Sequence, residues 1–291
     1  CLQTLICCVP KKGNLSFIAN FRPVCLVSHF LKLVNLLLLQ RIRTSIDPYL
    51  RSGQNGFRQN RGTMSHAMAV KLLIETGNPM FLLFVDFSSA FPSITFASIE
   101  SALRAFRVPQ KIIDAVMRCH KGHVVRVKGP DGLPIDGSYE MLTGVMQGDT
   151  LAPYLFIIVL DCLLDEMTHL KPFWLGGDAP RSAYAARLRP RSASCVHELG
   201  YADDLLFPCA NFEDMAPLLA ELQQKAKSVG LDVNLKKGKT EYLIVNHDED
   251  TEFPELRATD ADGNSVVVNR TYDYVYLGTN VADIFAQLMR R

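Results

Sequence analysis

Two kinds of hydrophobic pattern alternate along the chain. Apolar residues recur at helical spacing in six stretches, and each predicts a helix with a buried face: 31–42, 64–72, 99–106, 112–117, 151–167 and 215–229. Short apolar runs between turn residues predict strands at 81–85, 241–245, 266–268 and 274–277. Two hairpins are expected, at 123–139 around a turn at 129–132, and at 198–207. The pattern predicts a mixed α and β protein without internal repeats.

Residues at the ends of these stretches supply stop and start signals. Thr63 is expected to cap the helix 64–72, and Pro109 to open the helix 112–117. Gly230 is expected to end the helix 215–229. Residues 144–150 and 172–194 predict loops, because Gly, Pro, Ser and other loop-forming residues dominate them.

Composition narrows the class of protein. The 291 residues are 48% hydrophobic and 21% charged, which is typical of a globular protein and excludes disordered and collagen-like chains. Eight Cys without a C-x-x-C pair indicate thiols in a reducing compartment, and Cys119, His120 and His123 are interpreted as structural. No apolar run approaches the roughly 18 residues of a membrane helix. The first residue is not Met, so we expect a piece of a longer reading frame.

Charge is distributed unevenly. Residues 1–71 carry ten Lys or Arg against one acid, a net charge of +9, whereas the rest carries 21 against 29, a net charge of −8. A basic segment joined to an acidic body indicates a surface for a polyanion. Two oppositely charged surfaces without a ligand are the alternative.

Three acids are the main candidates for chemistry. Asp86 follows the strand 81–85 directly, and Asp203 and Asp204 lie at the tip of the hairpin 198–207. If the fold brings them together they repel one another, and divalent cations relieve that repulsion. Carboxylate oxygens suit Mg²⁺, and two such ions assist in-line phosphoryl transfer. An Asp-Asp pair alone is more often a solvated turn, but apolar flanks at Leu199 and 205–207 favour a buried hairpin.

Several motifs in order resemble the reverse transcriptase domain of non-LTR (LINE-type) retrotransposons, most closely its RTE-like branch. The three central motifs are FVDFSSAF at 84–91, GVMQGDTLAP at 144–153 and YADD at 201–204. Further similarity lies at 20–24, 32, 40–42, 56–63, 230–240 and 276–278. The resemblance covers residue 10 to about residue 281.

This resemblance implies an α+β fold of right-hand polymerase fingers and palm, with an antiparallel palm sheet backed by helices. Residues 1–79 would be mainly fingers, and 80–291 mainly palm with a fingers-linked helical and hairpin insertion around 101–140. A thumb and the family's endonuclease would be missing. The implied activity is RNA-directed DNA synthesis on an RNA template from a DNA primer and dNTP, in cytoplasm or nucleus and without a membrane. Oligomeric state is open.

The resemblance also implies roles for individual residues. Asp86, Asp203 and Asp204 would bind two Mg²⁺ ions, with Mn²⁺ as a possible substitute. Nucleotide contacts would come from Arg22, Lys11 or Lys12, Phe87, Phe91 (which would crowd a ribose 2′-hydroxyl), Gln147 and Gly148. Template or primer contacts would come from Phe57, Arg58, Arg61, Tyr201, Leu277 and Gly278.

Three points stay open at the level of sequence. Lys239 is a candidate general acid toward pyrophosphate, but the lysines at 236, 237 and 239 leave the choice ambiguous, and a solvated turn is an equal alternative. Asp149 is interpreted as a helix cap rather than a ligand. A catalytically inactive fragment that binds nucleic acid is the alternative function, and an RNA-dependent RNA polymerase is a further rival that Phe91 and the Tyr-Ala of YADD disfavour.

Overall fold

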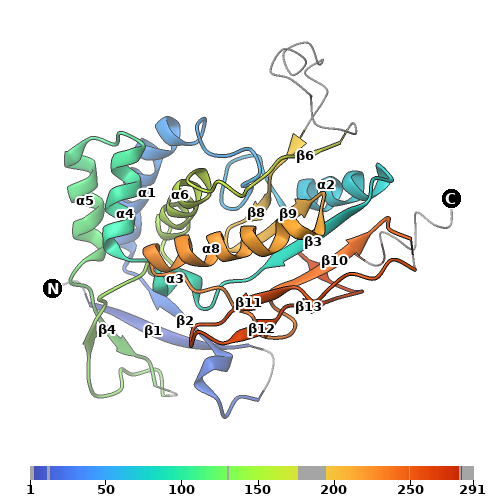
Figure 1. Ribbon diagram of the computed structural model, residues 1–291. Coiled ribbons are helices and arrows are strands. Elements are labelled where there is room, and N and C mark those ends of the chain that lie inside the picture. The colour runs from blue at the N-terminus through green and yellow to red at the C-terminus, as the bar shows by residue number, and fades with distance from the viewer. Residues whose placement is uncertain are drawn as a thin grey trace. The chain divides into compact units, whose positions relative to one another are not determined.

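The computed structural model describes residues 3–11, 14–129, 131–175, 195–248, 250–281 and 283 (Figure 1). The chain forms two compact units, each assembled from three separate stretches. The first unit comprises Cys1–Leu50, Ser89–Cys162 and Val229–Leu231, and the second comprises Arg51–Ser88, Leu163–Ser228 and Asp232–Arg291. Both units mix helices and strands, so the expected α+β class is confirmed. The expected border near residue 79 stays a prediction.

A five-stranded sheet forms the centre of the second unit. Its strands follow the order β13 (Asn269–Arg270), β10 (Glu241–Val245), β3 (Met80–Val85), β9 (Asp204–Cys209) and β8 (Leu199–Tyr201). The middle strand β3 pairs antiparallel with β10 and β9. Every residue of β3 is buried, which explains why its sequence is an unbroken apolar run rather than an alternating one.

Pro208 lies inside β9 without disrupting the sheet. It pairs with Leu82 of β3, whereas the pairing of β9 with β8 ends at Leu206. Pro lacks the backbone N–H that a residue of an inner strand can donate to a neighbouring strand. Pro208 is tolerated because the β8 side of β9 has no ladder partner at that point.

Among its described residues, the second unit contains the α-helices α2 (Thr63–Glu75) and α8 (Met215–Val229) and the 3-10 helix η2 (Phe212–Asp214). The helix α8 has the bounds that its apolar stripe predicts, and the next residue, Gly230, has the left-handed φ of +90° expected of a C-terminal cap. For α2 two details of the prediction were wrong. Its N-cap is Gly62 rather than Thr63. The stripe of Met64, Met68 and Leu72 faces solvent, while the buried face is formed by His66, Val70, Leu73 and Ile74.

Three further two-stranded sheets are described in the second unit. They are β6 (Phe173–Trp174) with β7 (Cys195–Val196), β11 (Arg257–Thr259) with β12 (Ser265–Val267), and β14 (Val275–Tyr276) with β15 (Thr279–Asn280). Most of the loop expected at 172–194 lies outside the described residues.

A four-stranded sheet in the order β2-β1-β4-β5 belongs to the first unit. Two of its strands, β1 (Gln3–Pro10) and β2 (Phe21–Leu26), are not among the strands that the hydrophobic pattern predicts. The strand β4 (Val124–Val127) pairs with β5 (Tyr139–Glu140), so the expected hairpin exists. Its second strand, β5, is two residues long and begins at Tyr139, the last residue of the hairpin expected at 123–139.

Five α-helices and one 3-10 helix, η1 (Ile18–Asn20), are described in the first unit, and the last of these α-helices continues into the second unit. The helices are α1 (His29–Ile46), α3 (Ala90–Ser93), α4 (Phe96–Ala105), α5 (Gln110–His120) and α6 (Ala152–Asp165). Ser28 caps α1 by accepting from the Leu31 N–H, and α5 packs against α4 and α1. Among the described residues, no helix is both long and apolar enough to cross a membrane.

Candidate active site

Asp86 is placed by the most buried strand of the second unit. Its N–H donates to Thr240 Oγ1 at 3.3 Å, and its carbonyl accepts from the Asn234 N–H at 2.8 Å. Val85 pairs with Leu205, so continuing the register by one residue places Asp86 across from Asp204. The end of β3 therefore carries a carboxylate whose backbone is fixed on both sides.

Asp203 and Asp204 lie on the hairpin formed by β8 and β9. Tyr201 pairs with Asp204, which leaves a two-residue turn of Ala202 and Asp203. Ala202 adopts a φ of +58°, the left-handed conformation that the first residue of such a tight hairpin turn requires. The expected hairpin with carboxylates at its tip is thus present.

Electrostatics indicates that the three carboxylates influence one another. The pKa of Asp204 is raised to about 6, first by partial loss of solvent around its carboxyl group and then by the negative charges of Asp203 and Asp86. Lys239 acts in the opposite direction. Since Asp204 as a residue is exposed, repulsion among the three acids is the cause that the geometry supports most directly.

Two side chains hold the Asp86 carboxylate. Asn234 Nδ2 donates to Oδ2 at 3.2 Å, and Lys239 Nζ forms an ion pair with Oδ1 at 3.2 Å. All three lysines are exposed, and Lys239 is the one whose Nζ contacts Asp86. Lys239 also lies in an exposed turn, so the choice between a general acid and a solvated turn stays open.

The residues suit a divalent cation, although they do not enclose one. Within the described ranges, no three His, Cys, Asp or Glu side chains lie close enough together to form a metal site as they stand. The oxygen donors and the mutual repulsion of Asp86, Asp203 and Asp204 nevertheless fit a hard cation. Mg²⁺ commonly binds one or two carboxylates and completes its shell with substrate phosphates and water.

The loop 51–62 lies against the hairpin in the second unit. Arg58 is 6% exposed, and its Nη1 donates to the carbonyl oxygens of Arg51 and Gln54. Arg61 Nη1 donates to the Ser52 carbonyl at 2.7 Å. The two arginines therefore organise this loop, and their expected contact with template or primer stays a prediction.

Aromatic residues flank the hairpin. The Phe57 ring, 44% exposed, lies 6.5 Å from that of Tyr201. Phe87 is 4% exposed, and its backbone forms an isolated antiparallel β-bridge with Val233; its nucleotide contact stays a prediction.

Leu277 and Gly278 form the turn of the hairpin β14–β15. Both have a positive φ, of 51° and 81°, as a two-residue turn of this kind requires. The hairpin is fixed to the sheet because the Tyr276 hydroxyl donates to the Leu199 carbonyl at 2.9 Å, and the Tyr274 ring stacks on Phe84 with 3.9 Å between centroids. The predicted primer contact of this turn is not tested by these distances.

In the first unit, the loop 144–150 packs on β2 and on the segment after Ser89. The Cys25 N–H donates to the Gln147 carbonyl at 2.6 Å, and a Cβ on Gly148 would lie 2.6 Å from the Cys25 carbonyl oxygen. Glycine is therefore required there by close backbone approach. The Val145 N–H donates to the Phe91 carbonyl at 2.9 Å. Phe91 itself stacks on Phe156, with ring centroids 4.8 Å apart.

Arg22 and Lys11 lie on the same sheet of the first unit. Arg22 belongs to β2, opposite Val9, and its side chain is exposed, as is that of Lys11. The Lys11 N–H donates to the Asn20 carbonyl at 2.7 Å. Lys12, the alternative to Lys11, lies outside the described residues. The nucleotide role of both described cations stays a prediction.

Asp149 is not the simple helix cap that its position suggested. It is buried, and its Oδ1 accepts from Asn35 Nδ2 at 2.9 Å and from the Thr150 N–H at 2.8 Å. Its Oδ2 lies 3.7 Å from His120 Nε2, while His120 Nδ1 lies 2.9 Å from the Val116 carbonyl. The network supports the loop 144–150 from inside, and it gives His120 the structural role expected of it.

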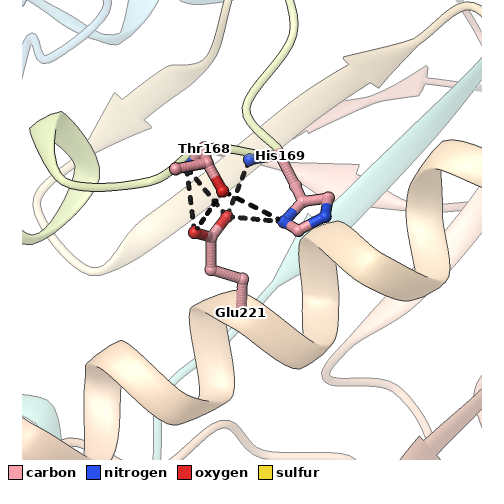
Figure 2. Close-up of polar contacts among 3 residues, drawn as sticks. All are labelled: Thr168, His169 and Glu221. Carbon is pink, nitrogen blue, oxygen red and sulfur yellow. Dashed lines mark hydrogen bonds and ion pairs between the residues drawn. The ribbon is translucent and has the colours of Figure 1, made fainter.

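A carboxylate outside the site holds a chain turn in the second unit. Glu221 accepts from the N–H groups of Thr168 and His169, and from the Thr168 hydroxyl at 2.9 Å (Figure 2). Although burial acts to raise it, the pKa of Glu221 is lowered to about 2 because these donors favour the charged form.

A cavity of about 400 Å³ also lies in the second unit, at the other end of β3 and β9 from the acids. It is lined by Pro79, Trp174, Pro208 and Leu218 among others. The catalytic candidates do not line it, so this cavity is not the site of interest.

Comparison with known proteins identifies the class. Residues 9–281 match the family described as "Reverse transcriptase (RNA-dependent DNA polymerase)". The chain belongs to this family and is a reverse transcriptase domain; enzymes of this family use divalent metal ions. The expectation drawn from the three motifs is confirmed.

Curated relatives place the domain among non-LTR retrotransposons. The Pol polyprotein of the type-2 retrotransposable element R2DM of Drosophila melanogaster is 27% identical over 94% of this chain and 24% of the relative. That of the type-1 element R2 of Popillia japonica is 24% identical over 79% of this chain and 30% of the relative. The chain thus spans about a quarter of the length of these relatives. Both are R2 elements, and the RTE-like branch stays a prediction.

Solved structures support the fold. Telomerase of Candida tropicalis, truncated from its C-terminal domain, aligns with a TM-score of 0.55 at 13% identity over 91% of this chain and 53% of that one. Telomerase of Candida albicans, in complex with a fragment of telomeric RNA, also aligns at 0.55 and 13% identity, over 89% and 43%. The α+β architecture of polymerase fingers and palm is thereby confirmed.

Proposed function

We propose that this domain copies an RNA template into DNA by adding deoxynucleotides to a primer 3′-hydroxyl. The observation that carries the proposal is the meeting of Asp86, at the end of β3, with the hairpin turn of Asp203 and Asp204. Membership of the reverse transcriptase family supports it. Three carboxylates at the end of a rigid sheet are suited to hold metal ions for nucleotidyl transfer. Binding of nucleic acid alone would not require them.

The acids would act through two Mg²⁺ ions. Bound there, the ions would lower the pKa of the primer hydroxyl and stabilise the leaving oxygen of the triphosphate. Asp86 and Asp203 would hold both ions, and Asp204 would be the third ligand. The fixed backbone of Asp86 and the tight turn that contains Asp203 would hold both carboxylates in place before substrate binds. The site would then need little rearrangement to reach the reactive geometry. Mn²⁺ offers the same charge and oxygen preference.

Other residues of the chain would bind the substrates. Arg22 and Lys11 are exposed cations suited to phosphate oxygens, and Gln147 with Gly148 would lie against the incoming nucleotide. Phe91 would exclude ribonucleotides. The exposed ring of Phe57, together with Tyr201, Leu277 and Gly278, would contact template or primer, and Arg58 and Arg61 would do so only indirectly, through the loop they organise.

We also propose the domain borders. Residues 1–79 would be mainly fingers, and 80–291 mainly palm with a fingers-linked insertion around 101–140. The interleaving of both compact units along the chain supports a palm that is interrupted by other segments.

The test is primer extension on an RNA template with Mg²⁺ and labelled dNTP. Asp203→Asn removes one charge with little change of shape, so extension should be lost while template binding, which is mainly electrostatic, persists. Asp262→Asn is a matched control, because Asp262 is exposed on the turn between β11 and β12. Extension by Asp203→Asn at the rate of the unchanged chain would refute the assignment, and absence of extension in the unchanged chain would favour a nucleic-acid-binding fragment.

A further inference from the structure

Gln54 lies buried beside the turn that carries Asp203. The residue is 4% exposed. Its Oε1 accepts from the Ala202 N–H at 2.9 Å and from the Gly56 N–H at 2.8 Å, and its Nε2 donates to the Ala202 carbonyl at 3.3 Å. One side-chain amide therefore pairs with both backbone polar groups of Ala202.

Ala202 needs such support because of its conformation. Its φ of +58° places a Cβ-bearing residue in the left-handed region, where alanine is unfavourable. Conformations of this kind persist when the surroundings hold them, and they gather at functional sites. The group that holds the peptide units on both sides of this residue is the Gln54 amide.

The backbone around Gln54 follows β8 like a short extra strand. The Gly200 N–H donates to the Gly53 carbonyl at 2.9 Å, and the Asn55 N–H donates to the Gly200 carbonyl at 2.8 Å. A Cβ on Gly53 would lie 2.2 Å from the Glu198 carbonyl oxygen, and one on Gly56 would lie 2.4 Å from the Ala202 nitrogen. Glycine on either side of Gln54 is what allows so close an approach.

An ion pair fixes this segment at its start. Arg51 Nε and Nη2 donate to the two oxygens of Glu198 at 2.9 and 2.7 Å, and the Glu198 side chain is 3% exposed. Arg58 Nη1 bonds the Gln54 carbonyl at 3.0 Å. A bidentate contact of this kind is geometrically specific, so Gln54 is held on a rigid segment.

We propose that Gln54 is a positioning residue for nucleotide addition: its side-chain amide fixes Ala202 and so the direction in which Asp203 and Asp204 leave the turn. This inference rests on the proposed polymerase function. Gln54 touches neither metal nor nucleotide in the proposal and acts through the hairpin backbone alone.

The first experiment compares Gln54→Met with Gln59→Met. Methionine keeps the length of the side chain but removes its hydrogen bonds, and Gln59 is an exposed residue of the same loop. We expect kcat for dNTP addition to fall about 10- to 100-fold in Gln54→Met, the cost of a small misplacement of catalytic groups. KM for dNTP and affinity for primer–template should not change, and Gln59→Met should behave like the unchanged chain.

The second experiment tests the hydrogen bonds between Gln54 and Ala202 without measuring enzyme activity. Hydrogen–deuterium exchange of a peptide spanning 200–205 should be faster in Gln54→Met than in Gln59→Met, because the Ala202 N–H loses its acceptor. Circular dichroism gives the folded fraction of each variant, so that kcat is expressed per folded molecule.

The outcomes separate the two proposals. Faster exchange together with a lower kcat and unchanged KM supports a positioning role. Unchanged exchange, or a kcat per folded molecule equal to that of the unchanged chain, overturns it. If the unchanged chain adds no nucleotide, the proposed function fails by itself, and exchange at 200–205 still decides whether Gln54 holds the turn.

Discussion

Lys239 and Asp86 form an ion pair, with 3.2 Å between Nζ and Oδ1, at the end of the central strand. The ammonium group occupies an oxygen that a divalent cation would use in the proposed mechanism. Lysine and cation would therefore compete for the same carboxylate.

Lys239→Met should reduce the Mg²⁺ concentration needed for half-maximal extension. Since the Lys239 side chain is 48% exposed, the pair is screened, and the change should be about two- to fivefold, corresponding to roughly 0.5–1 kcal/mol for an exposed ion pair. A Mg²⁺ titration of primer extension measures it, and Lys237→Met serves as control. A higher Mg²⁺ requirement would show that Lys239 does not compete with the ion. A lower rate at saturating Mg²⁺ would indicate its use as a general acid.

Phe91→Ala should weaken the choice of deoxy- over ribonucleotides. The ring would be replaced by a methyl group, so the 2′-hydroxyl would meet less crowding, and the ratio of kcat/KM for dNTP over rNTP should fall by about tenfold or more. Incorporation kinetics with matched dNTP and rNTP give this ratio. Because Phe91 also stacks on Phe156, Phe96→Ala on α4 is the control for lost aromatic volume. Unchanged sugar selectivity would refute the role of Phe91 as a gate.

Asp149→Leu should destabilise the protein strongly, whereas Asp149→Asn should be tolerated. The Asp149 Oδ1 accepts from Asn35 Nδ2 and from the Thr150 N–H, and the amide oxygen of asparagine can accept both bonds. Leucine would leave both donors without this acceptor. We expect a loss of about 1–3 kcal/mol for each donor left unpaired. Urea unfolding measures it, and equal stability of both variants would contradict this role of Asp149.

Glu221→Gln should lower stability at neutral pH, and the difference should shrink in acid. The carboxylate holds a turn through several donors, and their loss should cost about 1–3 kcal/mol. A lowered folded-state pKa means that the stabilisation is present above the ordinary value of 4.5 and is lost as pH falls toward about 2. Thermal unfolding from pH 7 to pH 2 follows this change. Glu213→Gln, at an exposed position before α8, is the control.

The sequence predicted the elements that carry the acids because their signals are local. An unbroken apolar run predicted β3, and apolar flanks around YADD predicted the hairpin. The strand β1 was not predicted, and its order comes from pairing with β2 and with β4, which lies more than a hundred residues further along the chain. The apolar stripe of α2 is exposed, because helical periodicity identifies an apolar face without showing that anything covers it.

Gln54 could not have been found from spacing. A glutamine between two glycines is typical of a loop, and its partner Ala202 lies 148 residues away. The only local hint was that glycines flank this segment, at 53 and 56. The Asp86–Lys239 contact was also inaccessible, because three lysines within four residues are equivalent until β10 fixes their register.

The burial of β3 has a consequence for inactivation by heat. All six of its residues are buried, and Asp86 follows them without an intervening loop. The acid can therefore leave its place only when the strand itself separates from β9 and β10, which dismantles the whole sheet. Loss of the catalytic arrangement and loss of the native fold should accordingly coincide in one cooperative melting event.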